Sequence, residues 1–388
     1  YICFMNVILF DENPSDLYPL SYTRPISCFR VGILTIKEKW ELFYKNVSIL
    51  TQDYLSSKFN LVISKDNLWI NSKIIPSPDL IVELKNLRDG ELLEKDKKLI
   101  AFRNGSFDKS KLNHIESNAS IICVNNLWDI FLLNDIEIRK DFKSLTYSRN
   151  SIALDDKNTI IGNQVFIEEG AHVSCSILNS EEGPIYIGKG AKVMEGSIIR
   201  GPFSMLEGSV LKMGAKIYGA TSLGPFCKVG GEVNNSVIFG YSSKAHDGFL
   251  GNSVIGEWCN LGADTNTSNL KNNYDTVKVW DYNVEKFINS EQQFCGLIMG
   301  DHSKSSINTM FNTGTVVGVS VNVFGSGFPR NFIPSFSWGG SSGYSEYSLT
   351  KVYEVVKRVF DRRNLIFSLL DQDILLSVFN MTKKYRKL

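Results

Sequence analysis

Aliphatic residues recur at every sixth position through the middle of the chain. The longest run holds eight consecutive sites of this kind: Ile187, Val193, Ile199, Met205, Leu211, Ile217, Leu223 and Val229. The residue four places after each site is mostly small, as at Ala191, Ser197 and Ala215. The same step reappears from Ile161, Ile255 and Phe311, and the gaps between these runs are not multiples of six. The gaps therefore mark inserted loops.

A period of six predicts a parallel β-helix with three hexapeptides per coil. Each hexapeptide forms one short strand whose aliphatic residue points into a triangular prism, with the small residue near the corner. One coil cannot bury its own apolar face, so coils must stack. The alternative is a β-sandwich of short strands, which has period two and no reason to sustain a period of six.

The first 150 residues follow a different pattern. Residues 6–10 indicate a buried strand, and residues 33–45 place Ile33, Ile36, Trp40 and Phe43 on one face of an amphipathic helix. Further strands are expected at residues 48–50, 61–63, 99–102 and 121–124, and a short linking helix at 128–133. Strands that alternate with helical segments are typical of an α/β domain.

The pattern becomes helical again after Ser345. Val352, Val355, Val356, Val359 and Phe360 recur at helical spacing, and an apolar helix is expected over residues 365–379. The basic residues 383–387 are expected to form a solvated end. The predicted organisation is an α/β domain over residues 1–150, a β-helix over 151–340 and a C-terminal helical arm over 341–388.

Composition narrows the class of protein. The chain has 388 residues, of which 43% are hydrophobic and 21% charged, so it can bury a sizeable core. Its 42 Lys+Arg and 41 Asp+Glu give a net charge of +1, which argues against a nucleic-acid partner. The sequence holds no run of about 18 apolar residues, so no membrane span is expected. The seven cysteines are scattered without a CxxC pair, which indicates neither a disulfide framework nor a zinc site and fits a cytoplasmic protein.

The first residues, Tyr1–Met5, lack the basic region and the long apolar region of a signal peptide. We therefore expect no signal peptide, and we expect translation to start at Met5.

Two of the four histidines lie where the hexad pattern breaks. His246 is in the segment 242–249 and His302 is in the segment 300–304. Loops on a rigid scaffold often carry function, and a histidine there can act as a general base near neutral pH. Asp247 or a main-chain carbonyl would fix the tautomer of His246. The alternative is a solvent-exposed or hydrogen-bonded loop residue.

The hexads, Lys244-Ala245-His246 and the downstream Asn260–Thr265 resemble the acetyltransferase half of the GlmU family. These enzymes are bifunctional UDP-N-acetylglucosamine pyrophosphorylases and glucosamine-1-phosphate N-acetyltransferases. The family has Ser-Lys-Ala-x-His and Asn-Ile-Gly-Ala-Gly-Thr, so one residue before His246 is missing here. Residues 5–340 are most similar to the alternate GlmU-like branch of Bacteroidetes, through the segments 17–25, 38–40, 256–260 and 308–314. The resemblance implies a left-handed β-helix after a nucleotidyltransferase-like domain.

The resemblance also implies roles for single residues. His246 matches the general base that takes a proton from the 2-amino group of glucosamine-1-phosphate as this group attacks the thioester of acetyl-CoA. Asn260 matches a residue at the acetyl-transfer site, Ala263 one that approaches acetyl-CoA, and Asn269 one on the sugar side. His302 would contact acetyl-CoA from a neighbouring subunit, because proteins of this kind form trimers with sites at their interfaces.

The family's phosphate-binding arginine has no match, because Gly230 stands in its place, and Phe249 replaces a substrate-binding tyrosine. Some cation must bind the sugar phosphate. The candidates lie on or near the coils and are Arg200, Lys212, Lys216, Lys228 and Lys244. For each of them the alternative is an exposed position on the β-helix.

In the first domain, residues 17–25 resemble the tail of the sugar nucleotidyltransferase signature. Residues 10–14 replace its glycine-rich loop with carboxylates, which suit a phosphate only if Mg²⁺ bridges them. Ile26 replaces the expected lysine. The cations that would substitute for it are Arg24, Arg30, Lys37 and Lys39, and Asn71 is a candidate for the nucleotide-binding edge. Two alternatives stay open: a divergent uridylyltransferase that uses UTP and Mg²⁺, or a domain that has lost its chemistry and serves binding or assembly.

The sequence thus predicts a homotrimeric transferase that acetylates glucosamine-1-phosphate and couples the product to UTP, giving UDP-N-acetylglucosamine. One alternative keeps the scaffold and changes the sugar. Another is a non-enzymatic trimeric scaffold with regulatory sugar-nucleotide binding.

Overall fold

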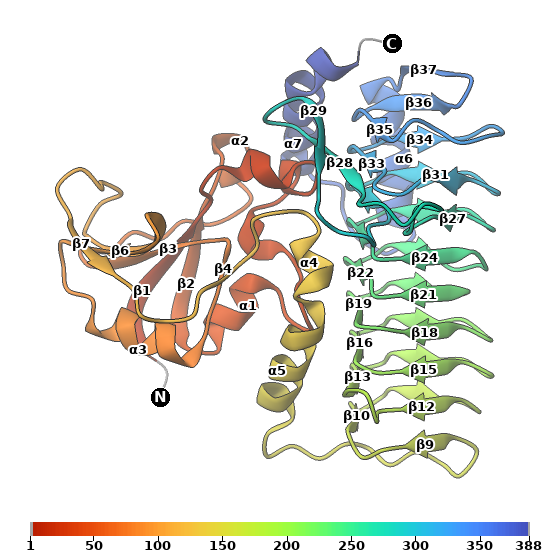
Figure 1. The fold of residues 1–388 in the computed structure, drawn as a ribbon, viewed down its shortest axis with the longest axis horizontal. Helices are drawn as coiled ribbons and strands as arrows, with labels where there is room; N and C mark the ends of the chain where they lie inside the picture. The colour runs from red at the N-terminus through yellow and green to blue at the C-terminus, as the bar shows by residue number, and fades with distance from the viewer. Residues whose placement is uncertain (1–2, 387–388) are drawn as a thin grey trace. The chain divides into compact units, whose positions relative to one another are not determined.

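The computed structural model describes residues 3–386 and divides into two compact units (Figure 1). The first unit consists of residues 1–17, 23–29 and 34–126, and the second of residues 18–22, 30–33 and 127–388. The first is an α/β unit, and the second holds a β-helix and two C-terminal helices. The predicted fold class, an α/β domain followed by a left-handed parallel β-helix and a helical arm, is confirmed. Between residues 3 and 386, no helix is long and apolar enough to cross a membrane.

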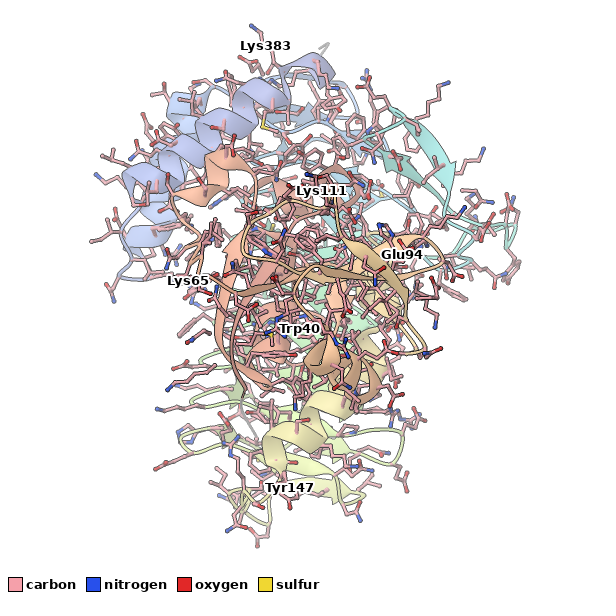
Figure 2. The ribbon with its side chains drawn as sticks, turned by 90° about the vertical axis from the view of Figure 1, so that its left-hand side faces the viewer. Trp40, Lys65, Glu94, Lys111, Tyr147 and Lys383 are labelled. Atoms are coloured by element: carbon pink, nitrogen blue, oxygen red, sulfur yellow. The ribbon has the colours of Figure 1, made fainter. Side chains whose placement is uncertain are left out.

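A six-stranded sheet forms the first unit, in the order β2-β1-β3-β6-β5-β7. Its strands are β1 (Cys3–Phe10), β2 (Tyr44–Leu50), β3 (Asn67–Asn71), β5 (Glu91–Lys95), β6 (Lys98–Arg103) and β7 (Asn113–Glu116), while β4 (Ile74–Ile75) pairs with β8 (Ile122–Cys123). The helices are α1 (Ile36–Glu41), α2 (Asp53–Ser56) and α3 (Pro78–Asn86). Because β1 runs parallel to β2 and β3, the carboxyl ends of these three strands meet at one edge. Trp40 on α1, labelled in Figure 2, is fully buried and donates a hydrogen bond to the Ile74 carbonyl.

Two expected elements differ from the structure. The predicted helix over 33–45 shortens to α1, because Thr35 caps it with a capping box and Tyr44 already begins β2. The expected strand at 61–63 is wrong, and the strand of this region is β3. Val62 and Ile63 are exposed, and the Val62 carbonyl accepts hydrogen bonds from the side chains of Asn6 and Ser48.

The β-helix has three faces of parallel strands. Face 1 contains β10 (Val165–Ile167), β13 (Ile185–Ile187), β16 (Phe203–Met205), β19 (Thr221–Leu223), β22 (Val237–Ile238), β25 (Val254–Ile255), β30 (Ile298–Met299), β33 (Val316–Val317) and β35 (Phe332–Ile333). Face 2 contains β11 (His172–Val173), β14 (Lys192–Val193), β17 (Val210–Leu211), β20 (Lys228–Val229), β23 (Ser243–Lys244), β26 (Asn260–Leu261), β31 (Lys304–Ser305), β34 (Asn322–Val323) and β36 (Ser337–Gly340), and ends in the antiparallel β37 (Gly343–Glu346).

Face 3 contains β9 (Thr159–Ile161), β12 (Ile177–Asn179), β15 (Ile198–Arg200), β18 (Lys216–Tyr218), β21 (Glu232–Asn234) and β24 (Phe249–Gly251), followed by the pair β27 (Asn266–Thr267) and β32 (Met310–Phe311). All eight residues of the long hexad run are buried in one apolar core inside the prism, which confirms the period-six interpretation. The predicted inserted loop after Leu261 carries an antiparallel hairpin of β28 (Lys278–Asp281) and β29 (Lys286–Asn289).

Helices complete the second unit. The linking helix α4 (Asp129–Leu132) is confirmed, and α5 (Asn134–Thr146) follows it. The Asn134 side chain on α5 donates a hydrogen bond to the Ala220 carbonyl, 2.8 Å away. The arm consists of α6 (Leu349–Asp361) and α7 (Leu369–Met381), and α7 begins after a capping box of Ser368 and Asp371.

The basic end is not simply solvated as expected. The Arg386 side chain is 1% exposed and its Nε lies 3.0 Å from a Glu346 carboxylate oxygen, while Lys384 pairs with Glu285. Lys387 lies outside the described residues.

We predict that Asp11 makes the stability of the first unit pH-dependent. Its carboxylate accepts hydrogen bonds from the Thr51 hydroxyl and the Ile26 N–H, but desolvation raises its pKa from 3.8 to about 6. The folded state then binds this proton more tightly, so the stabilisation is complete below pH 3.8 and is lost as the pH rises through 6. Between pH 4 and pH 7, calorimetry should show that the wild type loses up to about 3 kcal/mol relative to Asp11→Asn. The exposed Asp89→Asn serves as the control, and equal pH profiles for all three proteins would contradict the prediction.

Candidate active site

Corners between face 2 and face 3 bring several predicted residues together. A cavity of about 460 Å³ opens there, and its lining includes His246, Ala263 and Lys212 from three different coils. His246 follows β23, Ala263 follows β26 and Lys212 follows β17. The remaining lining residues are Met213, Gly230, Gly231, Ala245, Asp247 and Asp264. We call this cavity the notch.

The notch arises from a shortened corner. Residues 212–215 connect β17 to β18 and residues 245–248 connect β23 to β24, but only Gly230 and Gly231 connect β20 to β21. A Cβ on Gly230 would lie 2.6 Å from the Ala245 carbonyl oxygen, and one on Gly231 would lie 2.8 Å from Cα of Asp247. Any other residue here would have to push the neighbouring backbone away, so the glycines keep the notch open.

His246 is exposed at the rim of the notch, next to the exposed Asp247. Within residues 3–386, no hydrogen bond to the His246 imidazole is recorded. The expected fixing of its tautomer by Asp247 or by a main-chain carbonyl is therefore not formed in this structure. The imidazole keeps both nitrogens available to a molecule in the notch.

Lys244 does not line the notch but supports its wall from inside the prism. It pairs in register with the inward-facing Val229 and is 2% exposed. Its Nζ donates hydrogen bonds to the Gly230 carbonyl at 3.0 Å and to the His246 carbonyl at 2.7 Å. Burial lowers the pKa of Lys244 from 10.5 to about 8. The side chain thus connects the shortened corner to the corner that carries His246.

The other predicted residues of the β-helix lie elsewhere. Asn260 and Lys228 point outward from face 2 and line a second cavity of about 430 Å³. Lys304 and the arm residues Arg362 and Arg363 also line it, and the sequence did not indicate them. His302 lies next to this cavity, its ring parallel to that of Trp258 with the centroids 6.4 Å apart. The remaining candidates line neither cavity: Asn269 donates to the Asn252 side chain, Arg200 pairs with Glu182, and Lys216 is exposed on face 3.

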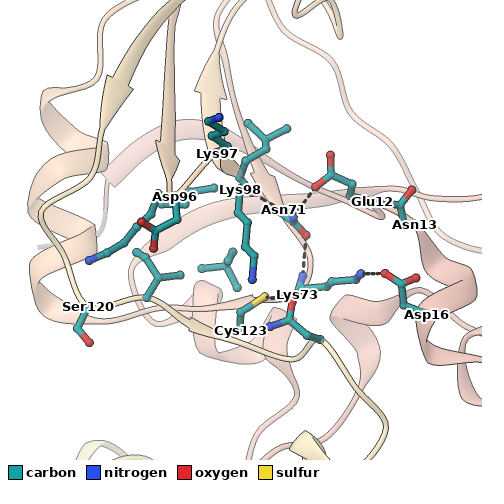
Figure 3. Close-up of a pocket in the computed structure, with 16 residues that line it drawn as sticks. Glu12, Asn13, Asp16, Asn71, Lys73, Asp96, Lys97, Lys98, Ser120 and Cys123 are labelled. Carbon is teal, nitrogen blue, oxygen red and sulfur yellow. Dashed lines mark hydrogen bonds and ion pairs between the residues drawn. The ribbon is translucent and has the colours of Figure 1, made fainter. Parts of the chain in front are cut away.

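The first unit has a cavity of its own, of about 600 Å³, at the carboxyl edge of β1 and β3 (Figure 3). Asn71 lines it and donates a hydrogen bond of 2.9 Å to the Glu12 carboxylate, while Lys73 pairs with Asp16. The predicted repulsion between carboxylates and a phosphate is thus partly offset by side chains of the chain itself. Three further lysines, Lys95, Lys97 and Lys98, line the same cavity and were not singled out from the sequence.

The predicted nucleotide-binding cations do not line this cavity. Arg24 and Lys39 are buried, and Lys37 pairs with Glu41. Arg30 belongs to the second unit, where it donates to the Ile33 carbonyl. The part of the chain that the structure describes has no group of three or more His, Cys, Asp or Glu side chains arranged to hold a metal ion.

Comparison with known proteins agrees with this architecture. Residues 7–150 match a family described as sugar nucleotidyl transferase. A protein named bifunctional protein GlmU from Methanococcus vannielii is 28% identical over 290 residues, which cover 72% of this chain and 60% of that protein. An alignment that covers 72% of the chain must include parts of both domains. The chain is therefore similar to GlmU proteins over parts of both domains.

A bifunctional protein GlmU from Methanococcus maripaludis is 30% identical over 228 residues, covering 59% of this chain and 47% of that protein. The GlmU-like chain thus spans at most about three fifths of these two relatives. Among solved structures, the polysialic-acid-specific acetyltransferase NeuO covers 50% of this chain and 87% of its own, with 16% identity and a TM-score of 0.27. A UDP-N-acetylglucosamine acyltransferase from Arabidopsis covers 60% and 93%, with 12% identity and a TM-score of 0.22.

We predict that Gly230→Ala destabilises the β-helix by about 1–3 kcal/mol, the usual cost of forcing extra atoms into a packed site. The reason is the contact of 2.6 Å that the new Cβ would make with the Ala245 carbonyl oxygen. Met213→Ala, which changes an exposed residue of the same notch, should stay within about 0.5 kcal/mol of the wild type. Urea unfolding of the three proteins tests this, and an unaltered Gly230→Ala midpoint would show that the corner has room.

Proposed function

We propose that this protein transfers the acetyl group of acetyl-CoA to the amino group of glucosamine-1-phosphate, with the notch as its active site. The observation that carries the proposal is an exposed histidine with unoccupied ring nitrogens at the rim of a cavity of about 460 Å³. The amine nitrogen attacks the thioester carbonyl carbon, the C–S bond breaks, and the CoA thiolate leaves. His246 accepts the proton that the amine loses and can return it to the leaving thiolate.

The charges of the notch suit an amino sugar phosphate. Lys212 offers one cation for the phosphate, where the family arginine at position 230 is missing. Asp247 and Asp264 are exposed carboxylates of the same lining and would attract the substrate's ammonium group before it is deprotonated. The substrate carries both charges, so the pattern favours it over a neutral sugar. Ala263 would lie beside the acetyl group.

We propose that the protein acts as a homotrimer. Ile177 and Ile198 pair in register on the outer side of face 3, and they are 38% and 47% exposed. Two neighbouring aliphatic side chains in water favour contact with another apolar surface. A second copy of the chain would supply such a surface.

We propose further that the first unit transfers a uridylyl group from UTP to the sugar 1-phosphate and releases pyrophosphate. Its cavity contains Lys95, Lys97 and Lys98, which provide positive charge for a triphosphate, while Lys73 pairs with Asp16. Figure 3 shows the Lys98 side chain extending into this cavity. Glu12 and Asp16 are the carboxylates of the lining that would hold Mg²⁺, and the ion would neutralise charge on the phosphates. The second alternative, a domain that only binds or assembles, is the outcome if no pyrophosphate forms.

The acetyl transfer predicts release of free thiol from acetyl-CoA when glucosamine-1-phosphate is added. His246→Ala should lower kcat by about 10²-fold or more, the scale of a lost general base. His172→Ala is the matched control, because His172 is also exposed on face 2 but lies in a different coil. If the wild type releases no thiol, the glucosamine-1-phosphate assignment is wrong and other amino-sugar phosphates are tested. An unchanged rate in His246→Ala would remove the histidine from the mechanism.

The uridylyl transfer predicts pyrophosphate from UTP, Mg²⁺ and N-acetylglucosamine-1-phosphate. Lys98→Gln should reduce kcat/KM about tenfold, since a charge-assisted contact to phosphate is lost. The exposed Lys65→Gln, which is outside the cavity lining, should behave as the wild type. Absence of pyrophosphate from the wild type would favour the binding or assembly role.

A further inference from the structure

The second cavity lies between face 2 and the helical arm. Its floor is a column of outward side chains on neighbouring coils, Lys228, Ser243, Asn260 and Lys304, which pair in register. Adjacent parallel strands are about 4.8 Å apart, so the column spans about 14 Å. Residues 359, 362 and 363, at the end of α6, form the other side of the cavity.

The cavity concentrates positive charge without a carboxylate. Four cations line it, namely Lys228, Lys304, Arg362 and Arg363, and no Asp or Glu does. Lys304 donates to the His302 carbonyl and Arg363 to the Phe226 carbonyl, and no ion pair of any of the four is recorded among residues 3–386. Burial, together with the charges of Arg363, Arg362 and Lys212, lowers the pKa of Lys228. Such a cluster repels itself until an anion enters.

Aromatic residues stand beside the same cavity at an unusual backbone position. Phe226, Tyr241 and Trp258 occupy the corner from face 1 to face 2 in successive coils, each with φ between 57° and 63°. Glycines occupy this corner in earlier coils, at Gly190 and Gly208. Bulky residues rarely adopt positive φ, so the coil itself does not favour them here.

The rings stack on one another. The centroids of Tyr241 and Trp258 are 4.2 Å apart with the planes 10° from parallel, and Phe360 of α6 lies 4.3 Å from Trp258. Tyr241 and Trp258 both line the cavity. Tyr241 thus lies between the rings of Phe226 and Trp258, and Trp258 lies between those of Tyr241 and Phe360, so the cavity meets the edges of this stack beside the four cations.

We propose that this cavity binds a nucleoside phosphate. A base would lie against the ring edges of Tyr241 and Trp258, and the phosphates would lie against Lys228, Lys304, Arg362 and Arg363. The cavity volume of about 430 Å³ falls within the range of small-molecule sites. The proposal does not depend on the acetyltransferase assignment.

Two sources share this chemistry: the nucleotide end of CoA and a free uridine nucleotide. The cavity and the notch lie at opposite edges of face 2. Asn260 lines the first and Ala263 the second, and three residues of extended chain span about 10 Å. A CoA whose nucleotide end occupies this cavity could therefore extend its arm across face 2 toward His246, whereas a uridine nucleotide would bind here as a separate ligand.

Equilibrium binding by the full-length protein tests the proposal with three probes: CoA, UDP and inorganic pyrophosphate. Lys228→Gln and Arg362→Gln should each weaken binding of the preferred nucleotide about tenfold, and the affinity should fall with added salt. Arg358→Gln is the matched control, because Arg358 lies one turn earlier on α6, pairs with Glu354 and is not in the lining. All three of these positions are exposed, and thermal melting confirms that the variants are folded.

The outcomes separate the sources. CoA binding that is sensitive to Arg362→Gln identifies the acetyl donor, and sensitive UDP binding identifies a uridine nucleotide. UDP bound in the first unit would not respond to Arg362→Gln. His246→Ala should keep the binding whatever becomes of the acetyl transfer. Pyrophosphate binding as tight as that of both nucleotides, no response to Lys228→Gln and Arg362→Gln, or an equal loss in Arg358→Gln would overturn the proposal.

Discussion

The structure of the second unit depends on the closure of a narrow apolar prism. Each coil contributes one inward side chain per face, and only the coils above and below can cover it. The parallel ladders hold neighbouring coils in register, so a change in chain length within a strand would move its inward residue out of line. Changes in length must therefore fall at corners or in inserted loops. The two-residue corner at Gly230–Gly231 and the hairpin of β28 and β29 both follow this rule.

Because the inward positions must fill the prism, the residues that can bind a ligand lie mainly at the corners. Lys244 shows the cost of a charged group at an inward position: its ammonium group is tolerated because the carbonyl oxygens of two adjacent corners accept hydrogen bonds from it. Because Lys244 lies inside the prism and bonds to the His246 carbonyl, the backbone position of His246 depends on the packing of the core. The corners from face 1 to face 2 are less constrained, because their side chains point out of the prism and can differ from one coil to the next. There aromatic rings take positions that glycine occupies in earlier coils.

Periodicity predicted the β-helix well because each hexad reports directly on one inward position, as Ile187 to Val229 show. It predicted the first unit less well, since short runs such as residues 61–63 look alike whether they are strands or exposed loops. The site was harder still. Lys212, His246 and Ala263 meet because corners of successive coils stack, and the hexad spacing indicates this stacking. The notch itself depends on the length of one corner, Gly230–Gly231. Arg362 and Arg363 join Lys228 only because the arm folds back on face 2, and no local pattern encodes that contact.

Net charge illustrates the limit of composition in the same way. A balance of +1 over 388 residues argues against long polyanions, which need an extended basic surface. It says nothing about small anions, because a few residues from distant parts of the chain decide the local field. Here four cations gather at one edge of face 2, while two carboxylates and one lysine line the other edge. A molecule with a polyphosphate at one end and a reactive carbonyl at the other would experience both fields at once. The electrostatic asymmetry across a single face of the prism is thus the feature that most constrains what this GlmU-like protein can bind.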